Sequence, residues 1–213
     1  MASPFLQEMT ASEPLTLEEE YDMQKSWHED SNKCTFILLG LPDCAKIEND
    51  ISMDYIRDKA VMIGDVNIFL NDCDGDMSFG EIEIMVAEEA YRRHGYGLEG
   101  LKMMMAYASK DLHIKTFHAK ISMKNTPSIH LFEEKLAFYP ISQSEIFQEI
   151  TLEWSIQQQD SLVSNNDNDD DGTDQYGSKA TTLQKENCIL LHESLMKMWE
   201  QEIQKLRWDN TLL

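Results

Sequence analysis

The sequence predicts a single mixed α/β domain, and three observations carry this prediction. The chain has 213 residues, of which 42% are apolar, so it can bury a sizeable core. Segments that alternate apolar and polar residues, as half-buried strands do, are interspersed with segments whose apolar residues recur at helical spacing. Two such strands, at 81–87 and 115–121, flank a helix, and this crossover favours a parallel pair.

The first half of the chain predicts one helix and two strands. Thr16 and Glu19 form a capping-box pattern, which indicates a helix through about residue 27. Residues Cys34–Leu39 (CTFILL) and Val61–Leu70 (VMIGDVNIFL) are typical of strands. In the second strand, one face is expected to carry Met62, Gly64, Val66, Ile68 and Leu70.

The second half of the predicted domain continues this alternation. Residues 81–87 (EIEIMVA) alternate cleanly, and a helix begins around Gly97 with apolar residues at three- and four-residue spacing. A strand follows at Lys115–Ile121 (KTFHAKI). A helix is expected from Pro127, because proline favours the first helical turn, and a last strand at Ile146–Trp154.

The composition changes near residue 160. Residues Asp160–Gly177 contain six Asp and no Lys or Arg, which is typical of a disordered segment. We therefore expect a domain at 1–155, an acidic linker at 156–181 and an amphipathic helix within 182–213. This helix either binds a partner or packs on the chain's own core, and its apolar spacing favours packing.

Charge and cysteine content exclude several classes of protein. The chain has 18 Lys and Arg against 39 Asp and Glu, a formal net charge of −21, which argues against nucleic-acid binding. No apolar run is long enough to span a membrane. The four cysteines are scattered and no secretory signal precedes them, so we expect reduced thiols and a cytoplasmic location.

The most specific segment is Arg92–Gly97 (RRHGYG), which lies between a strand and a helix. Glycines allow the backbone to approach a ligand closely, and the N-terminus of the next helix presents free N–H groups to an anion such as a pyrophosphate. An ordinary strand-to-helix turn is the alternative. Gly95, Gly97 and Gly100 also match a dinucleotide-binding pattern, but they do not follow the strand directly and the expected acidic residue is missing.

These motifs together resemble the GNAT superfamily of acetyl-coenzyme A-dependent N-acetyltransferases. The segments that show this resemblance are EIEIMVA, RRHGYG, KTFHAKI and NTPSIHLFEEKLAF. Further segments, including TASEPLTLEEEYDMQKSW and GDVNIFL, are similar to the N-acetyltransferase 9 family of tubulin N-terminal acetyltransferases. The similarity extends from about Leu6 to Leu152. It implies a sheet whose central parallel strands splay apart around acetyl-coenzyme A.

The resemblance also assigns residues to the coenzyme. Backbone N–H groups around Met85 and Val86 would bind the pantetheine and polarise the acetyl carbonyl. The pyrophosphate would lie on the segment that comprises Arg92, Arg93, His94, Gly95, Tyr96 and Gly97, with the Arg92 side chain assisting. Asn125 and Phe132 would contact the coenzyme near its sulfur. Phe132 stands where many members have a tyrosine that protonates the leaving thiolate. Here Tyr139 or a water molecule would have to donate that proton, or coenzyme A would leave as the thiolate.

Two carboxylates are candidates for the base that takes the amine proton. Glu81 and Glu83 are two residues apart on one strand, so they share a face. Glu81 is the first choice and Glu83 the second, and Asp65 on the neighbouring strand is a weaker candidate. A pair of carboxylates raises one pKa towards neutrality, which suits a base.

Full members of the family begin with a further strand and helix, so the resemblance implies an N-terminally truncated domain. The missing strand would pair with Cys34–Leu39, and we expect an exposed hydrophobic edge there. The expected activity is transfer of acetyl from acetyl-coenzyme A to a protein amine, such as the N-terminus of tubulin, by direct attack. The alternative is a weakened or inactive isoform that acts as an interaction module.

No metal is expected. The polar turn Asn71–Ser78 imitates a calcium loop with Asp72, Asp74 and Asp76, but Met77 stands where such a loop needs glycine. A second imitation, at 167–178, has Ser178 at the last ligand position instead of a glutamate.

Overall fold

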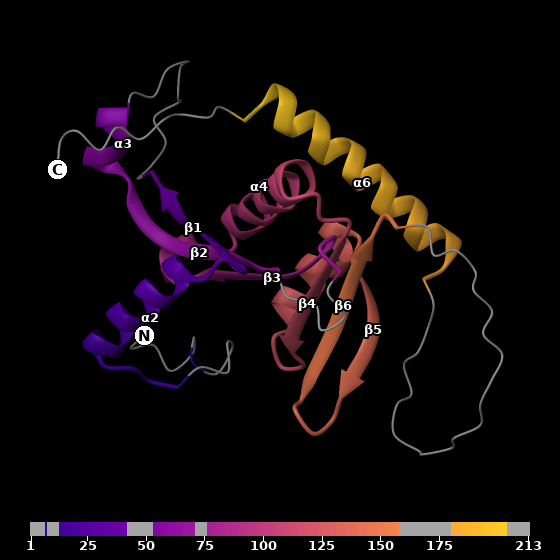
Figure 1. The fold of residues 1–213 in the computed structure, drawn as a ribbon, viewed down its shortest axis with the longest axis horizontal. Helices are drawn as coiled ribbons and strands as arrows, with labels where there is room; N and C mark the ends of the chain where they lie inside the picture. The colour runs from indigo at the N-terminus through magenta and orange to yellow at the C-terminus, as the bar shows by residue number, and fades with distance from the viewer. Residues whose placement is uncertain (1–6, 8–12, 42–52, 71–75, 158–179, 204–213) are drawn as a thin grey trace.

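One mixed sheet organises the molecule. The computed structural model describes residue 7 and residues 13–41, 53–70, 76–157 and 180–203. Within them, six strands follow the order β1-β2-β3-β4-β6-β5 (Figure 1). These are β1 (Lys33–Gly40), β2 (Val61–Phe69), β3 (Phe79–Val86), β4 (Thr116–Ser122), β5 (Tyr139–Ser144) and β6 (Glu149–Ser155). The predicted α/β class is confirmed.

The two central strands separate after a short contact. β3 and β4 are parallel and pair only over Phe79–Glu81 and Thr116–His118. On either side, the antiparallel ladders β2–β3 and β4–β6 are longer; the second extends over the whole of β4. Beyond Glu81 the two strands therefore diverge, which confirms the splayed parallel pair that the resemblance implies.

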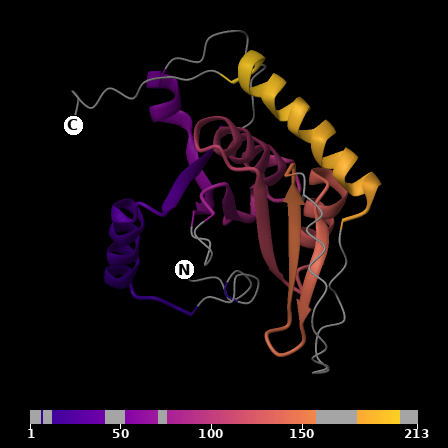
Figure 2. The same cartoon turned by 45° about the vertical axis from the view of Figure 1, so that its right-hand side comes forward.

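Helices cover both faces of the sheet. α4 (Tyr96–Asp111) connects β3 to β4 and lies on one face, whereas α2 (Leu17–Glu29) lies on the opposite side of β1–β3 (Figures 1 and 2). The capping box of α2 is present: the Thr16 side chain accepts a hydrogen bond from the Glu19 backbone, and the Glu19 side chain accepts one from Thr16. The remaining short elements are α3 (Met53–Lys59), η1 (Glu89–Tyr91), α5 (Thr126–His130) and the π-helical turn η2 (Leu131–Lys135).

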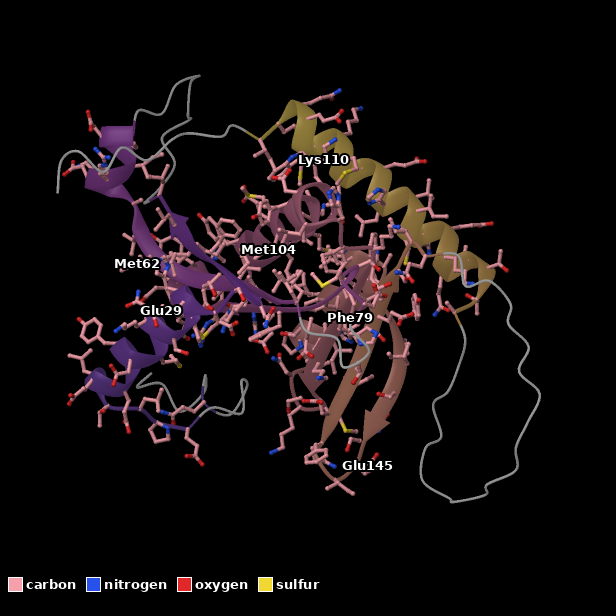
Figure 3. The ribbon with its side chains drawn as sticks, viewed as in Figure 1. Glu29, Met62, Phe79, Met104, Lys110 and Glu145 are labelled. Atoms are coloured by element: carbon pink, nitrogen blue, oxygen red, sulfur yellow. The ribbon has the colours of Figure 1, made fainter. Side chains whose placement is uncertain are left out.

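The C-terminal helix α6 (Thr182–Gln201) packs on the chain's own core. It crosses α4 and reaches β6 (Figure 1), and Lys110 of α4 is 3.7 Å from Glu200 of α6 (Figure 3). Cys188 and Leu195 are fully buried in this contact. Within 182–201 this segment therefore packs on the chain's own core, the favoured alternative, and residues 158–179 of the expected linker at 156–181 lie outside the described residues.

The structure differs from the prediction in three main respects. The last strand begins at Glu149, because Ile146 and Phe147 form the tip of the β5–β6 hairpin and are 88% and 79% exposed. Figure 3 labels the neighbouring Glu145 at this tip. β5 and α3 were not predicted. Met62 does not share the buried face, because β2 extends beyond the end of β3 there and pairs only with β1.

The expected hydrophobic edge is present in the described part of the chain. β1 pairs with β2 alone, and its side chains Phe36, Ile37 and Leu39 are each about half exposed. An open strand edge with apolar side chains is a surface on which other chains can pair.

Candidate active site

A cavity of about 350 Å³ lies where β3 and β4 separate. This volume is within the usual range for small-ligand sites. Most of its walls come from β2, β3, β4, α5 and η2, with Trp27 of α2 and Phe147 of the β5–β6 hairpin also in the lining. The polar residues that line it are Asp65, Asn67, Glu81, Glu83, Lys120, Ser122, Asn125, Ser128 and Glu149.

The cavity contains both predicted carboxylates, but in different environments. Glu81 accepts a hydrogen bond from Lys120, with 2.6 Å between Oε2 and Nζ. Among the described residues, the Glu83 side chain forms no hydrogen bond or ion pair of this kind. Glu83 is still exposed at the cavity surface, yet partial desolvation there, and secondarily the charge of Glu81, raises the pKa of Glu83 above its ordinary value.

Two buried polar residues of β2 add to this wall. Asn67 donates a hydrogen bond to Asp65 at 3.0 Å and accepts one from Thr35 of β1 at 2.6 Å. Asp65 and Asn67 are 8% and 4% exposed, and burial raises the pKa of Asp65. Sequence reasoning gave Asp65 a minor place and missed Asn67. Two polar side chains within an otherwise apolar strand, VMIGDVNIFL, were the available signal.

The segment before α4 has the backbone of an anion-binding turn. Gly95, the N-cap residue of α4, has φ +92°, and Arg93 has φ +63°. Apart from neighbouring residues of the chain, no atom lies within 4 Å of the position of a Cβ added at Gly95, so the turn is open to solvent there. The first amides of α4 follow directly, and a helix N-terminus favours negative charge. His94 closes the turn locally, with Nδ1 2.7 Å from the Arg92 carbonyl oxygen.

The end of β3 presents backbone amides to the splayed region. The Ala87 N–H donates to the Ile63 carbonyl of β2. Because N–H groups alternate sides along a strand, the Met85 N–H is directed to β2 as well. The Val86 N–H is then directed to the side of β4, where the strands have separated. Of the two predicted positions, Met85 lines the cavity, whereas Val86 lies outside its lining but directs its N–H to the side on which β4 has separated.

The comparisons with known proteins agree with this geometry. Residues 2–135 match the model of the acetyltransferase (GNAT) domain. The chain belongs to the GNAT acetyltransferase family. It is 51% identical over 154 residues to an N-acetyltransferase 9-like protein of Nematostella vectensis, covering 72% of this chain and 73% of that protein. It is 45% identical over 156 residues to the human alpha/beta-tubulin-N-acetyltransferase 9, covering 73% of this chain and 72% of that protein.

Solved structures share the fold of this acetyltransferase. A domain from Methanocaldococcus jannaschii superposes with a TM-score of 0.55 at 22% identity, covering 72% of this chain and 86% of that domain. A spermidine N-acetyltransferase from Vibrio cholerae, solved with CoA and spermine, superposes with a TM-score of 0.51 at 15% identity. This match covers 69% of this chain and 79% of that one. Family membership makes this chain an acetyl-coenzyme A-dependent N-acetyltransferase.

Asn125 and Phe132, which the resemblance assigns to the coenzyme, both line the cavity of this acetyltransferase. Asn125 is the N-cap of α5, and its side-chain oxygen accepts from the Ser128 N–H at 3.3 Å. Phe132 is 2% exposed and packs edge-to-face on Phe138, so its ring is a fixed part of the wall. Tyr139 does not line the cavity. It is buried and donates to Glu153 at 2.5 Å, and burial raises its pKa strongly, so it is poorly placed as the acid.

Two further findings concern the described residues only. No group of three or more His, Cys, Asp or Glu side chains could hold a metal ion there. Among the helices of that same part, none is long and apolar enough to cross a membrane. Asp72 and Asp74 of the first calcium-like segment, and the whole of the second at 167–178, lie outside the described residues.

Proposed function

We propose that this acetyltransferase acetylates the N-terminal α-amino group of a protein, and that tubulin is the first acceptor to test. Support comes from the human relative, which is named alpha/beta-tubulin-N-acetyltransferase 9 and is 45% identical. The acidic lining of the cavity suits an acceptor that arrives as an ammonium ion. The free thiols Cys34 and Cys188 support the expected cytoplasmic location.

The observation that carries the mechanism is the contrast between Glu81 and Glu83. Glu81 is held by Lys120, whereas Glu83 faces the same cavity with a raised pKa caused chiefly by burial. A base is most effective when its pKa lies close to the working pH. The geometry therefore favours Glu83 as the base and gives Glu81 a supporting role, reversing the order that the sequence suggests.

The transfer then needs no covalent enzyme intermediate. The ammonium first loses one proton to Glu83, directly or through water, and the neutral amine nitrogen then attacks the thioester carbonyl carbon. The carbon–sulfur bond breaks, and the second nitrogen proton passes through water to the departing thiolate or to solvent as coenzyme A leaves. The Val86 N–H would stabilise the developing oxyanion, as a positioned backbone donor does in acyl transfer. With Tyr139 outside the cavity and Phe132 unable to donate, a water molecule protonates the thiolate or it departs unassisted.

The test combines binding and turnover. Acetyl-coenzyme A should raise the thermal midpoint of the purified chain in a saturable manner. A synthetic peptide with the N-terminal sequence of tubulin should gain one acetyl group at its α-amine, detected by mass spectrometry. Glu83→Gln should lower kcat by about 10²–10⁴-fold, the usual contribution of a general base.

Two results would reject parts of this proposal. A matched control, Glu186→Gln on the exposed face of α6, should keep the full rate. If Glu83→Gln behaves like this control while Glu81→Gln loses turnover, Glu81 is the base. If acetyl-coenzyme A binds but only internal lysines of a peptide are acetylated, the proposed class of acceptor is wrong.

A further inference from the structure

The ion pair between Lys120 and Glu81 joins the two central strands at the point where they part. Glu81 belongs to the last backbone pair of β3 and β4, in which it lies opposite His118. Lys120 is two residues further along β4, and its Nζ reaches back to Glu81 Oε2 at 2.6 Å. Both side chains line the cavity. The pair therefore stands at the apex of the splayed region.

Fold stability does not account for this pair. The Lys120 and Glu81 side chains are 47% and 22% exposed, and they share a single close contact. Ion pairs that are partly exposed to water add little to stability, because solvent screens the attraction and the side chains lose freedom. Its place in the cavity wall indicates a role in the site.

The charges around Glu83 show what that role is. Glu81 lies on the same strand, Asp65 on β2 and Glu149 at the start of β6, so carboxylates approach from three strands. Two cations oppose them: Lys120 on β4, and Lys33 on β1, which lies over the Trp27 and Phe69 rings. Of these two, Lys120 is the one that makes a direct hydrogen bond to a neighbouring carboxylate of the cavity.

We propose that Lys120 is a positioning residue of the acceptor site: it holds and neutralises the Glu81 carboxylate, so that Glu83 takes the amine proton. This inference rests on the proposed function, in which Glu83 is the base. Burial and the charge of Glu81 raise the pKa of Glu83, while Lys33 and Lys120 lower it. Removing Lys120 leaves Glu83 protonated, and so unable to accept a proton, over a wider pH range.

The experiment compares four variants of the full chain. Lys120→Met removes the cation, Lys120→Arg keeps it, and Glu81→Gln removes its partner. Lys115→Met is the matched control, because it removes one positive charge from the residue preceding β4 without touching the cavity lining. The first readout is the titration of the Glu83 side-chain carbon by NMR in the free enzyme, assigned by its absence in Glu83→Gln. The second is the pH profile of kcat/KM with the tubulin-derived peptide.

Lys120→Met should move the Glu83 midpoint and the acidic limb of kcat/KM upward together by at least about half a pH unit, roughly threefold in proton affinity. Its rate loss at neutral pH should disappear at alkaline pH. Glu81→Gln should move the midpoint downward, and Lys120→Arg and Lys115→Met should leave it near that of the parent chain. Glu81→Gln also tests the idea if Lys120→Met fails to fold.

An unchanged Glu83 midpoint in Lys120→Met, or an equal shift in Lys115→Met, would overturn the inference. So would a loss of rate that is the same at every pH, because that indicates a structural role. Failure of the proposed function looks different: the parent chain would bind acetyl-coenzyme A without acetylating the peptide. The NMR titration would still decide whether Lys120 controls Glu83.

Discussion

The Arg92 side chain is hydrogen-bonded to the backbone of Val86, the last residue of β3. Its Nε donates to the Val86 carbonyl oxygen at 2.9 Å, and Nη2 donates to the neighbouring Ala87 carbonyl at 2.7 Å. These hydrogen bonds fix the turn before α4 relative to the end of β3. The resemblance assigns the Arg92 side chain to the pyrophosphate. In the structure this side chain also holds the turn against β3.

Arg92→Met should therefore weaken acetyl-coenzyme A binding by roughly tenfold. The reason is geometric: two charge-assisted hydrogen bonds are lost, and the turn is no longer held against β3. Isothermal titration calorimetry would measure the change. Arg93→Met is the comparison, because Arg93 is exposed and its loss should cost about twofold and vanish at high salt. A larger loss for Arg93→Met would mean that charge matters more than the fixed turn.

Two glycines of the same turn should respond in opposite ways. Gly95 has φ +92°, so Gly95→Ala should cost about 1–2 kcal/mol of stability through backbone strain alone. Gly97 lies within the first turn of α4, and a Cβ there would meet Val86 Cγ2 at an ordinary 3.6 Å. Gly97→Ala should be neutral or stabilising by up to about 1 kcal/mol. Urea unfolding would measure the change in unfolding free energy of both variants. Equal destabilisation of the two would contradict the predicted contrast.

The sequence predicted the central part of the fold because its patterns are local. The crossover from β3 through α4 to β4 has clean periodicity, and RRHGYG needs a tight turn wherever it occurs. β5 (YPISQS) was missed because a proline and polar residues hide an edge strand. The apolar Ile146 and Phe147 suggested a strand and instead form an exposed hairpin tip.

The site was predictable only in part, since its chemistry depends on pairs that are distant in sequence. Glu81 and Lys120 are 39 residues apart, and Thr35 and Asn67 are 32 residues apart. Spacing along the chain showed that Glu81 and Glu83 share a face. It could not show that a lysine from another strand, Lys120, would form its ion pair with Glu81 and not with Glu83.

Glu83→Gln should stabilise the protein while it removes the proposed base. The pKa of Glu83 is raised in the folded state by burial, so the folded chain binds this proton more tightly than the unfolded chain. Stability then falls as pH rises from about 4, the ordinary glutamate pKa, and stays lower above the folded pKa. Glu83→Gln should unfold at a slightly higher temperature at pH 7, a gain kept small because solvent reaches the exposed Glu83 side chain, and it should lose this advantage near pH 4. A lower midpoint at pH 7 would contradict the assigned burial effect.

Glu153→Gln should destabilise the protein at neutral pH, the opposite of the effect expected for Glu83→Gln. Although burial opposes it, hydrogen bonds from His118 at 2.9 Å and Tyr139 at 2.5 Å hold the pKa of Glu153 below its ordinary value. A depressed carboxyl pKa adds stability above the unfolded pKa of about 4 and loses it as pH falls through the folded value. The variant should be about 1–3 kcal/mol less stable at pH 7 and approach the parent chain in acid. Thermal unfolding across pH would measure this, and a constant difference at all pH values would count against it.

The docking of α6 predicts a contrast between two leucines on one helix. Leu195 is 1% exposed and belongs to the main core, whereas Leu190 is 62% exposed. Leu195→Ala should cost about 2–5 kcal/mol through lost contacts and the cavity left behind, and Leu190→Ala should stay within about 0.5 kcal/mol of the parent chain. Urea unfolding followed by tryptophan fluorescence would report both, because Trp154 is buried in the same core and Trp199 packs against it. If the two variants unfold alike, α6 leaves the core in solution, and its apolar face becomes available to a partner.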